Sequence, residues 1–524
     1  MTVDELYNNG LTAYRRGDLP SCAALAAQAI ARNPRHGPAH LLRAVSLPAS
    51  EVAVSAAHYS AATRLTPLGA EHWFNRGVFY ESRLRIHDAA ECYRRAIHLD
   101  PLHLGALING TQLIRVTDSF EEALRLARRL QRLDPDGHIG HGHEAICLQH
   151  LGLLEEADAA FAEAVRRSPD PSLLHWEHHF SHLVRRNFAE AWEKYEVRFA
   201  CGYANGVRDM AFTLPPWDGA SGQHVLVYGE QGLGDQIMFA SALPDLLAVS
   251  SKVSLAVHPV LVDLFTASFP QIAVLPIGNG EEPQECEAVL AAATKEKEVN
   301  AVLPIGSLMT HFRNGEAKFD GRPFLQPSKT AQAYWQKRRP SRVSVKANKS
   351  SGTSSSRKQP FQLGICWASN PAPERFFSAR RAIHKTMPLD RMACLVQRND
   401  LEAVAVTNVS LDQFDGEEST KARIEDVSQD LINLDRTAAL MQSLDLVITV
   451  DTGIAHLAGS LGVPVWILLH KAADPRWGEW GCETSYWYKS ARLFWQTHPG
   501  DWNELIERVS SELDITINTN RSGA

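Results

Sequence analysis

The sequence lacks several features that mark common classes of protein. Its eight cysteines are scattered and none form a C-x-x-C pair, which argues against a disulfide framework or a cysteine-rich zinc site. Residues 1–29 have no cationic start followed by an apolar segment, so we expect no secretory signal. The net charge is −7, and this argues against a nucleic-acid partner. Together these absences predict a cytoplasmic protein.

What is present is typical of a globular protein. The chain has 524 residues, of which 44% are hydrophobic and 22% charged, and this length predicts two to four domains. One nearly apolar stretch, residues 445–469, has the length of a membrane span. Asp451, His456 and Pro464 interrupt it, so we predict no transmembrane segment.

The N-terminal part of the chain carries an internal repeat. Prolines that close amphipathic helical patterns recur at intervals of 33 or 34 residues, at Pro34, Pro67, Pro101, Pro135 and Pro169. The third unit matches the tetratricopeptide pattern at Trp73, Gly77, Tyr80, Ala89, Tyr93, Ala96 and Pro101. The period predicts an all-α tetratricopeptide solenoid over residues 1–206, which binds protein partners or serves as a structural spacer.

Two patterns in the repeat region have the spacing of metal ligands. Four histidines share one helical face, at His175, His178, His179 and His182. No cysteine or carboxylate set completes that site, and the D-x-D at residues 134–136 falls in a turn between repeats. We therefore predict no metal ion.

A glycine-rich loop follows the first strand after the repeats. Residues 225–228 read as a strand, residues 230–235 as the loop, and a helix begins near Ile237. The loop has neither the G-K-[ST] of a P-loop nor G-x-G-x-x-G, but its position suits a phosphate or sugar at a sheet edge. Asp235 at the helix start is a candidate general base, and a helix cap is the alternative. Residues 215–335 are thus predicted to form a Rossmann-like domain.

Residues 336–360 separate this domain from a second one. The segment holds eight Lys or Arg and seven Ser and no acidic residue, which is typical of a flexible linker or insertion. The second Rossmann-like domain is predicted over residues 361–513, with a tail at residues 514–524.

The stretch at residues 445–469 reads as strand, turn, helix and strand. Asp451, Thr452 and Gly453 end the first strand, and His456 lies one turn into the helix that starts near Ile454. Such a turn suits a phosphate, although an ordinary buried βαβ unit is also consistent with it. A cationic loop that suits a diphosphate precedes it, with Arg375, Arg380, Arg381 and Lys385.

Five segments together resemble one enzyme family. They are GEQGLGDQIMFASALP (229–244), LGICWASNP (363–371), KTMPL (385–389), VDTGIAHLAGSLGVPVWILL (450–469) and DPRW (474–477). They resemble the ADP-heptose:lipopolysaccharide heptosyltransferase family of GT-B glycosyltransferases, in the bacterial branch with an N-terminal tetratricopeptide array. The resemblance implies a C-terminal α/β GT-B fold of two Rossmann-like domains.

The resemblance also implies a mechanism and a set of site residues. It implies metal-independent, inverting transfer from a nucleotide-sugar substrate, without a cofactor. Asp235 is expected to act as the base and Lys385 as the catalytic cation. The expected donor and phosphate contacts are Gln231, Gly232, Gly234, Arg381, Asp451, Thr452, Gly453, Ile454 and His456. Base or sugar contacts are expected at Trp367, Asn370 and Trp477. The acidic residue that holds the donor sugar in the family has no clear counterpart, so heptose is not specified.

The acceptor is left open by the sequence. A protein presented by the repeat array is the first expectation, such as flagellin or another surface protein. One alternative is a lipid or polysaccharide acceptor. Another is a non-catalytic scaffold that binds partner proteins and only senses a nucleotide sugar.

Overall fold

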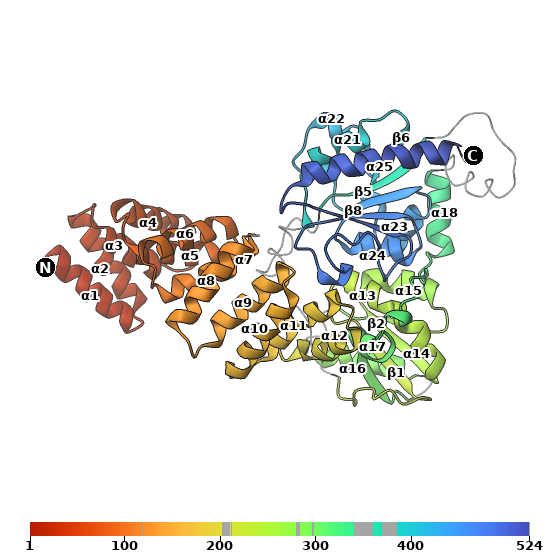
Figure 1. Cartoon of the computed structure of the whole chain (residues 1–524), viewed down its shortest axis with the longest axis horizontal. Helices are drawn as coiled ribbons and strands as arrows, with labels where there is room; N and C mark the ends of the chain where they lie inside the picture. Colours follow the sequence, from red (N-terminus) through yellow and green to blue (C-terminus); the bar gives the residue numbers. More distant parts are fainter. Residues whose placement is uncertain are drawn as a thin grey trace. The chain divides into compact units, whose positions relative to one another are not determined.

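The computed structural model describes residues 1–117, 119–201, 210, 212–278, 283–295, 298–339, 360–368 and 385–522. The chain divides into two compact units, Met1–Leu174 and His175–Ala524 (Figure 1). Two of the predicted site residues, Asn370 and Arg381, lie outside the described residues, as does most of the predicted linker.

The first unit is built of helices, as predicted. Consecutive helices pack against each other along the chain. In order they are α1 (Val3–Arg15), α2 (Leu19–Arg32), α3 (Gly37–Ser46), α4 (Val52–Leu65), α5 (Ala70–Glu81), α6 (Ile86–Leu99), α7 (Leu104–Val116), α8 (Phe120–Leu133), α9 (His138–His150) and α10 (Leu154–Arg167).

Small residues let these helices approach. A Cβ added to Gly77 of α5 would lie 2.6 Å from the Tyr93 ring of α6, so only glycine fits at that crossing. In α10, Ala157, Phe161 and Ala164 are buried at the spacing of one helical face. The predicted tetratricopeptide-like helical region is confirmed.

The second unit begins with helices that the sequence pattern assigned to the repeats. These are α11 (Ser172–Val184), α12 (Phe188–Tyr195) and the short η1 (Glu196–Phe199). Trp192 is buried in the core of the second unit and donates its indole N–H to the Arg313 carbonyl at 2.9 Å. The division of the chain therefore falls before the predicted array end at residue 206, because the aromatic side chains of these helices pack onto the α/β fold.

The first sheet of this unit is parallel with the strand order β3-β2-β1-β4. Its central strand β1 (His224–Tyr228) is buried throughout, as expected for a parallel strand covered on both faces. The other strands are β2 (Lys252–Val257), β3 (Ala273–Pro276) and β4 (Ala301–Pro304). The associated helices are α13 (Leu233–Phe239), α14 (Leu243–Val249), α15 (Val262–Ser268), α16 (Pro283–Ala293) and α17 (Leu308–Phe312).

The second sheet is parallel with the order β10-β9-β8-β5-β6-β7. Its strands are β5 (Phe361–Cys366), β6 (Leu401–Ala405), β7 (Ile424–Glu425), β8 (Leu446–Val450), β9 (Val465–Leu469) and β10 (Ala491–Trp495). Its longer helices are α18 (Lys329–Arg338), α23 (Leu434–Met441), α24 (Gly453–Ser460) and α25 (Trp502–Ser522). The strand order reverses between β5 and β8, and ligands of such sheets bind at the carboxyl ends of the strands at this point.

Two helices differ from the predicted boundaries. Helix α25 continues to Ser522 and lies along the second sheet (Figure 1), because Leu513 and Ile517 are buried in its core, so the predicted tail from residue 514 is mostly helical. The predicted linker starts inside α18, whose Trp335 donates to the Arg436 carbonyl at 2.8 Å. No helix in the described ranges is long and apolar enough to cross a bilayer.

Candidate active site

The site forms where two short helices, one after each central strand, meet. Helix α13 follows β1 and helix α24 follows β8, and they touch through two glycines. A Cβ on Gly234 would lie 3.2 Å from the Gly453 Cα and 3.0 Å from His456 Cδ2. A larger residue at position 234 would crowd α24, whereas a Cβ on Gly453 would lie 3.6 Å from Gly234 N, an ordinary contact distance. These glycines were predicted as phosphate contacts, and the structure also gives them this packing role.

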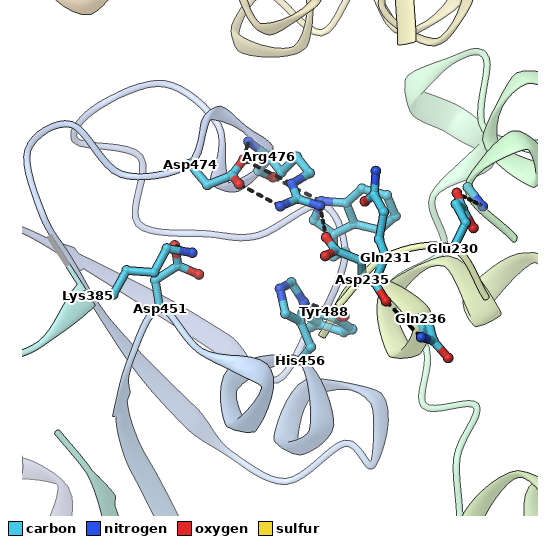
Figure 2. Close-up of polar contacts among 12 residues, drawn as sticks. Glu230, Gln231, Asp235, Gln236, Lys385, Asp451, His456, Asp474, Arg476 and Tyr488 are labelled. Carbon is cyan, nitrogen blue, oxygen red and sulfur yellow. Dashed lines mark hydrogen bonds and ion pairs between the residues drawn. The ribbon is translucent and has the colours of Figure 1, made fainter. Parts of the chain in front are cut away.

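Asp235 lies in the lobe built on the first sheet (β1–β4), and an arginine from the lobe built on the second sheet (β5–β10) pairs with it. The Arg476 guanidinium forms an ion pair with Asp235, and its Nη2 lies 2.6 Å from Asp474 Oδ2 (Figure 2). The Arg476 side chain is only 13% exposed. An adjacent cation favours the ionised carboxylate, which is the form a general base requires. The sequence analysis assigned no role to Arg476, because its partner Asp235 lies 241 residues away along the chain.

Lys385 and Asp451 are brought together. Lys385 Nζ lies 2.6 Å from Asp451 Oδ2, and the Asp451 side chain is 6% exposed. Both were predicted near the donor phosphates, and here each neutralises the other. The pair sits at the carboxyl end of β8, next to the point where the strand order reverses.

His456 lies between these two ion pairs (Figure 2). Its ring stacks on Trp477 with centroids 4.8 Å apart, and Nδ1 is 3.0 Å from the Tyr488 hydroxyl. Burial lowers the pKa of His456 to about 4, so the imidazole is neutral at pH 7. At pH 7 the ring therefore carries one N–H group and no full positive charge.

The glycine-rich loop is anchored from beneath by a buried ion pair. Arg198 of η1 lies 3.3 Å from Glu230 Oε1, and neither side chain is exposed. The Gly306 N–H also donates to Glu230 at 3.2 Å, and burial raises the pKa of the Glu230 carboxyl. Sequence reasoning missed this pair, because η1 read as the end of the repeats. Further along the loop, the Gln236 side chain donates to the Gln231 carbonyl at 2.8 Å.

The positions of the remaining predicted residues give no direct indication of a role in the site. Trp367 is buried after β5 and packs edge-on against Phe414 at 5.0 Å. Gly232 precedes α13, while Thr452 precedes α24 and Ile454 lies in its first turn. Among the described residues no group of three or more His, Cys, Asp or Glu side chains is placed to hold a metal ion.

Two of the buried histidines, His179 and His456, predict a pH dependence of stability. Burial lowers the pKa of His179 to about 3 and that of His456 to about 4, against about 6.5 when unfolded. As the pH falls, the unfolded chain therefore binds protons at these histidines before the folded chain does. The contribution of the two neutral histidines to the free energy of unfolding is full above pH 6.5 and is lost as the pH falls toward 4. We expect the urea midpoint to drop over this range, and His456→Gln to reduce the drop. Equal slopes for the variant and the wild type would contradict this.

Two models of known protein families match parts of the chain. The family model for glycosyltransferase family 9 (heptosyltransferase) matches residues 428–492, which contain β8, α24, β9 and Arg476. A tetratricopeptide-repeat model matches residues 49–103 and 114–170.

Relatives and solved structures are similar to the whole chain or to its first part. Protein FlbA of Caulobacter vibrioides is 28% identical over 539 residues, covering 95% of this chain and 82% of FlbA. The tetratricopeptide protein YrrB, described as having an unusual peptide-binding site, is 17% identical with a TM-score of 0.30, covering 34% of this chain and 93% of YrrB. PilF of Pseudomonas aeruginosa is 16% identical with a TM-score of 0.32, covering 38% of this chain and 92% of PilF.

The fold defines a protein in which a helical repeat array precedes an α/β glycosyltransferase fold. The sequence matches in both parts agree with this division. The chain combines a tetratricopeptide-repeat region with a segment that matches glycosyltransferase family 9 (heptosyltransferase), as the resemblance predicted.

Proposed function

We propose that the protein is a metal-independent, inverting glycosyltransferase that moves a sugar from a nucleotide-sugar donor to a protein acceptor. One observation carries the proposal. Asp235 of the first lobe, held by Arg476, lies in one cluster with His456 and the Lys385–Asp451 pair of the second lobe. A carboxylate is thus placed beside groups that bind anions, at the edge where such sheets take their ligands.

The proposed reaction uses these residues directly. Asp235 accepts the proton of the acceptor hydroxyl as its oxygen attacks the anomeric carbon. The bond from that carbon to the phosphate oxygen breaks, and the nucleotide diphosphate leaves with the electron pair. The Lys385 ammonium and the His456 N–H stabilise the growing negative charge, and a donor of this kind is typically worth about 3–4 kcal/mol.

Donor binding is the direct test. A thermal-shift screen against nucleotides and nucleotide sugars, in EDTA, is expected to identify one donor class. A ligand at 100 times its Kd stabilises the fold by about 2.7 kcal/mol. We expect His456→Ala to weaken this shift, while His498→Ala, which alters an exposed histidine in another loop, serves as the matched control. A folded protein without a hit would contradict the proposal.

Truncation tests the acceptor. A variant that starts at Pro171 keeps α11, α12 and η1, so Trp192 and Arg198 stay in their buried places. We expect this variant to fold and to bind the donor, but to lose transfer to a protein acceptor, which in this proposal is flagellin-like or another surface protein. Full transfer to a protein by the truncated variant would refute presentation by the array. Transfer to lipid or polysaccharide that survives truncation would favour the alternative acceptor.

A donor-sensing scaffold is the second candidate. It is favoured by one observation, that Asp235 and Lys385 are both ion-paired in the structure. Donor binding without turnover, in the presence of the natural protein partner, would establish it.

A further inference from the structure

Tyr488 is buried against His456, and its ring packs on Gly459. The tyrosine side chain is fully buried, and its hydroxyl lies 3.0 Å from His456 Nδ1. A Cβ added to Gly459 of α24 would lie 2.4 Å from the Tyr488 ring, so the ring occupies space that only glycine leaves. The position of the hydroxyl is therefore fixed by packing.

The donor and the acceptor of the hydrogen bond between Tyr488 and His456 can be assigned from the partners available to each group. The structure shows no other hydrogen bond for the Tyr488 hydroxyl within the described ranges. If His456 Nδ1 carried the proton and donated it, the buried tyrosine proton would be left without an acceptor. A buried hydrogen-bond donor without an acceptor is unfavourable, because the group has lost its hydrogen bond to water and gained none. The tyrosine therefore donates to Nδ1, and the neutral ring carries its proton on Nε2.

The other ring nitrogen is placed to use that proton. Within the described residues, Nε2 has no hydrogen-bond partner. The atom is not fully buried either, so it remains accessible to solvent. Trp477 stacks on one face of the ring, and Gly234 lets the other lobe approach Cδ2. The ring is thus held in one orientation between the Lys385–Asp451 and Arg476–Asp235 pairs (Figure 2).

The charges around the His456 ring show why an uncharged hydrogen-bond donor is useful there. Asp235, Asp451 and Asp474 face two cations, Arg476 and Lys385, so the described cluster already has one excess negative charge. These carboxylates would favour a charged imidazolium, yet burial outweighs them and keeps the ring neutral. A neutral imidazole carries a single N–H, and it offers this group at Nε2 only in the Nε2–H tautomer.

We propose that Tyr488 is a positioning residue that fixes His456 as the neutral Nε2–H tautomer, which donates to an anionic oxygen of the donor's diphosphate. The choice of ligand rests on the proposed function. The tautomer does not, because it follows from the hydrogen bonds of the protein alone.

The tautomer can be measured without any substrate. The full chain labelled with 15N-histidine is examined by NMR at pH 7, and the His456 signals are identified by their loss in His456→Gln. We expect a protonated Nε2 and an unprotonated Nδ1. Tyr488→Phe keeps the ring in its seat and removes only the hydroxyl, so it is expected to fold and to give a mixture of tautomers. A protonated Nδ1 in the wild type, or an unchanged spectrum in Tyr488→Phe, would overturn the proposal.

A matched pair of substitutions tests which nitrogen donates. The amide nitrogen of Gln can take the place of Nε2, whereas that of Asn lies nearer Nδ1. Binding of inorganic pyrophosphate is measured by calorimetry in EDTA. His456→Asn is expected to bind about 10-fold or more weakly, as for loss of a hydrogen bond to a charged group, while His456→Gln stays close to wild type.

The outcomes separate the two proposals. Equal affinities for the Gln and Asn variants would overturn donation through Nε2. Failure of the wild type to bind pyrophosphate would overturn the diphosphate as ligand, while the NMR result would still establish the tautomer. A donor found by the thermal-shift screen, together with measured sugar transfer, would then support the proposed function independently.

Discussion

Replacing Asp235 by Asn is expected to lower the rate of sugar transfer by about 10²–10⁴-fold, the usual contribution of a general base. Asn has nearly the same shape and can still accept a hydrogen bond from Arg476, but it cannot take up the acceptor's proton. Donor affinity should change little, because Lys385 and His456, the groups proposed to stabilise the diphosphate, lie on the second lobe. The rate is measured as product formed per enzyme at saturating donor.

A matched control separates this effect from the loss of a charge. Asp320→Asn removes a carboxylate paired with Arg322, and the two side chains are 57% and 75% exposed. We expect this variant to transfer at the wild-type rate. Undiminished turnover by Asp235→Asn would exclude the residue as the base, and a loss of donor binding would instead assign it to the donor site.

Replacing Arg476 by Met is expected to destabilise the second unit by about 3–5 kcal/mol, since one partner of a buried ion pair is removed. The change leaves Asp235 and Asp474 with 16% and 10% exposed side chains and no opposite charge from this arginine. Transfer should fall as well, because Asp235 loses the group that orients it. Urea unfolding followed by tryptophan fluorescence measures the stability.

Two comparisons test the cause. Arg322→Met breaks an exposed pair and should cost no more than about 1 kcal/mol. Adding Asp474→Asn to Arg476→Met removes one of the two carboxylates that the arginine paired with, and it should recover part of the loss. A cost as small as that of Arg322→Met would show that the ion pair between the lobes contributes little to the fold.

The sequence alone predicted the repeat array and the segment around His456. A period of 33 or 34 residues can be read directly, because every repeat buries the same positions against its neighbours. The stretch from Leu446 to Leu469 could be read as strand, helix and strand, because the two strands are continuous apolar runs and Gly462 and Pro464 end the helix. Asp235, Lys385 and His456 were predicted as site residues from their motifs and from the family resemblance, and their roles stay predictions.

Only the tertiary structure decided which charges meet. Arg476 pairs with Asp235 across 241 residues, and Arg198 pairs with Glu230 from a helix that reads as part of the repeats. Periodicity reports which face of an element is buried, but not which other element buries it. The role of Tyr488 was hidden for the same reason, because a tyrosine among aromatic residues differs from its neighbours only once its hydroxyl is placed against His456.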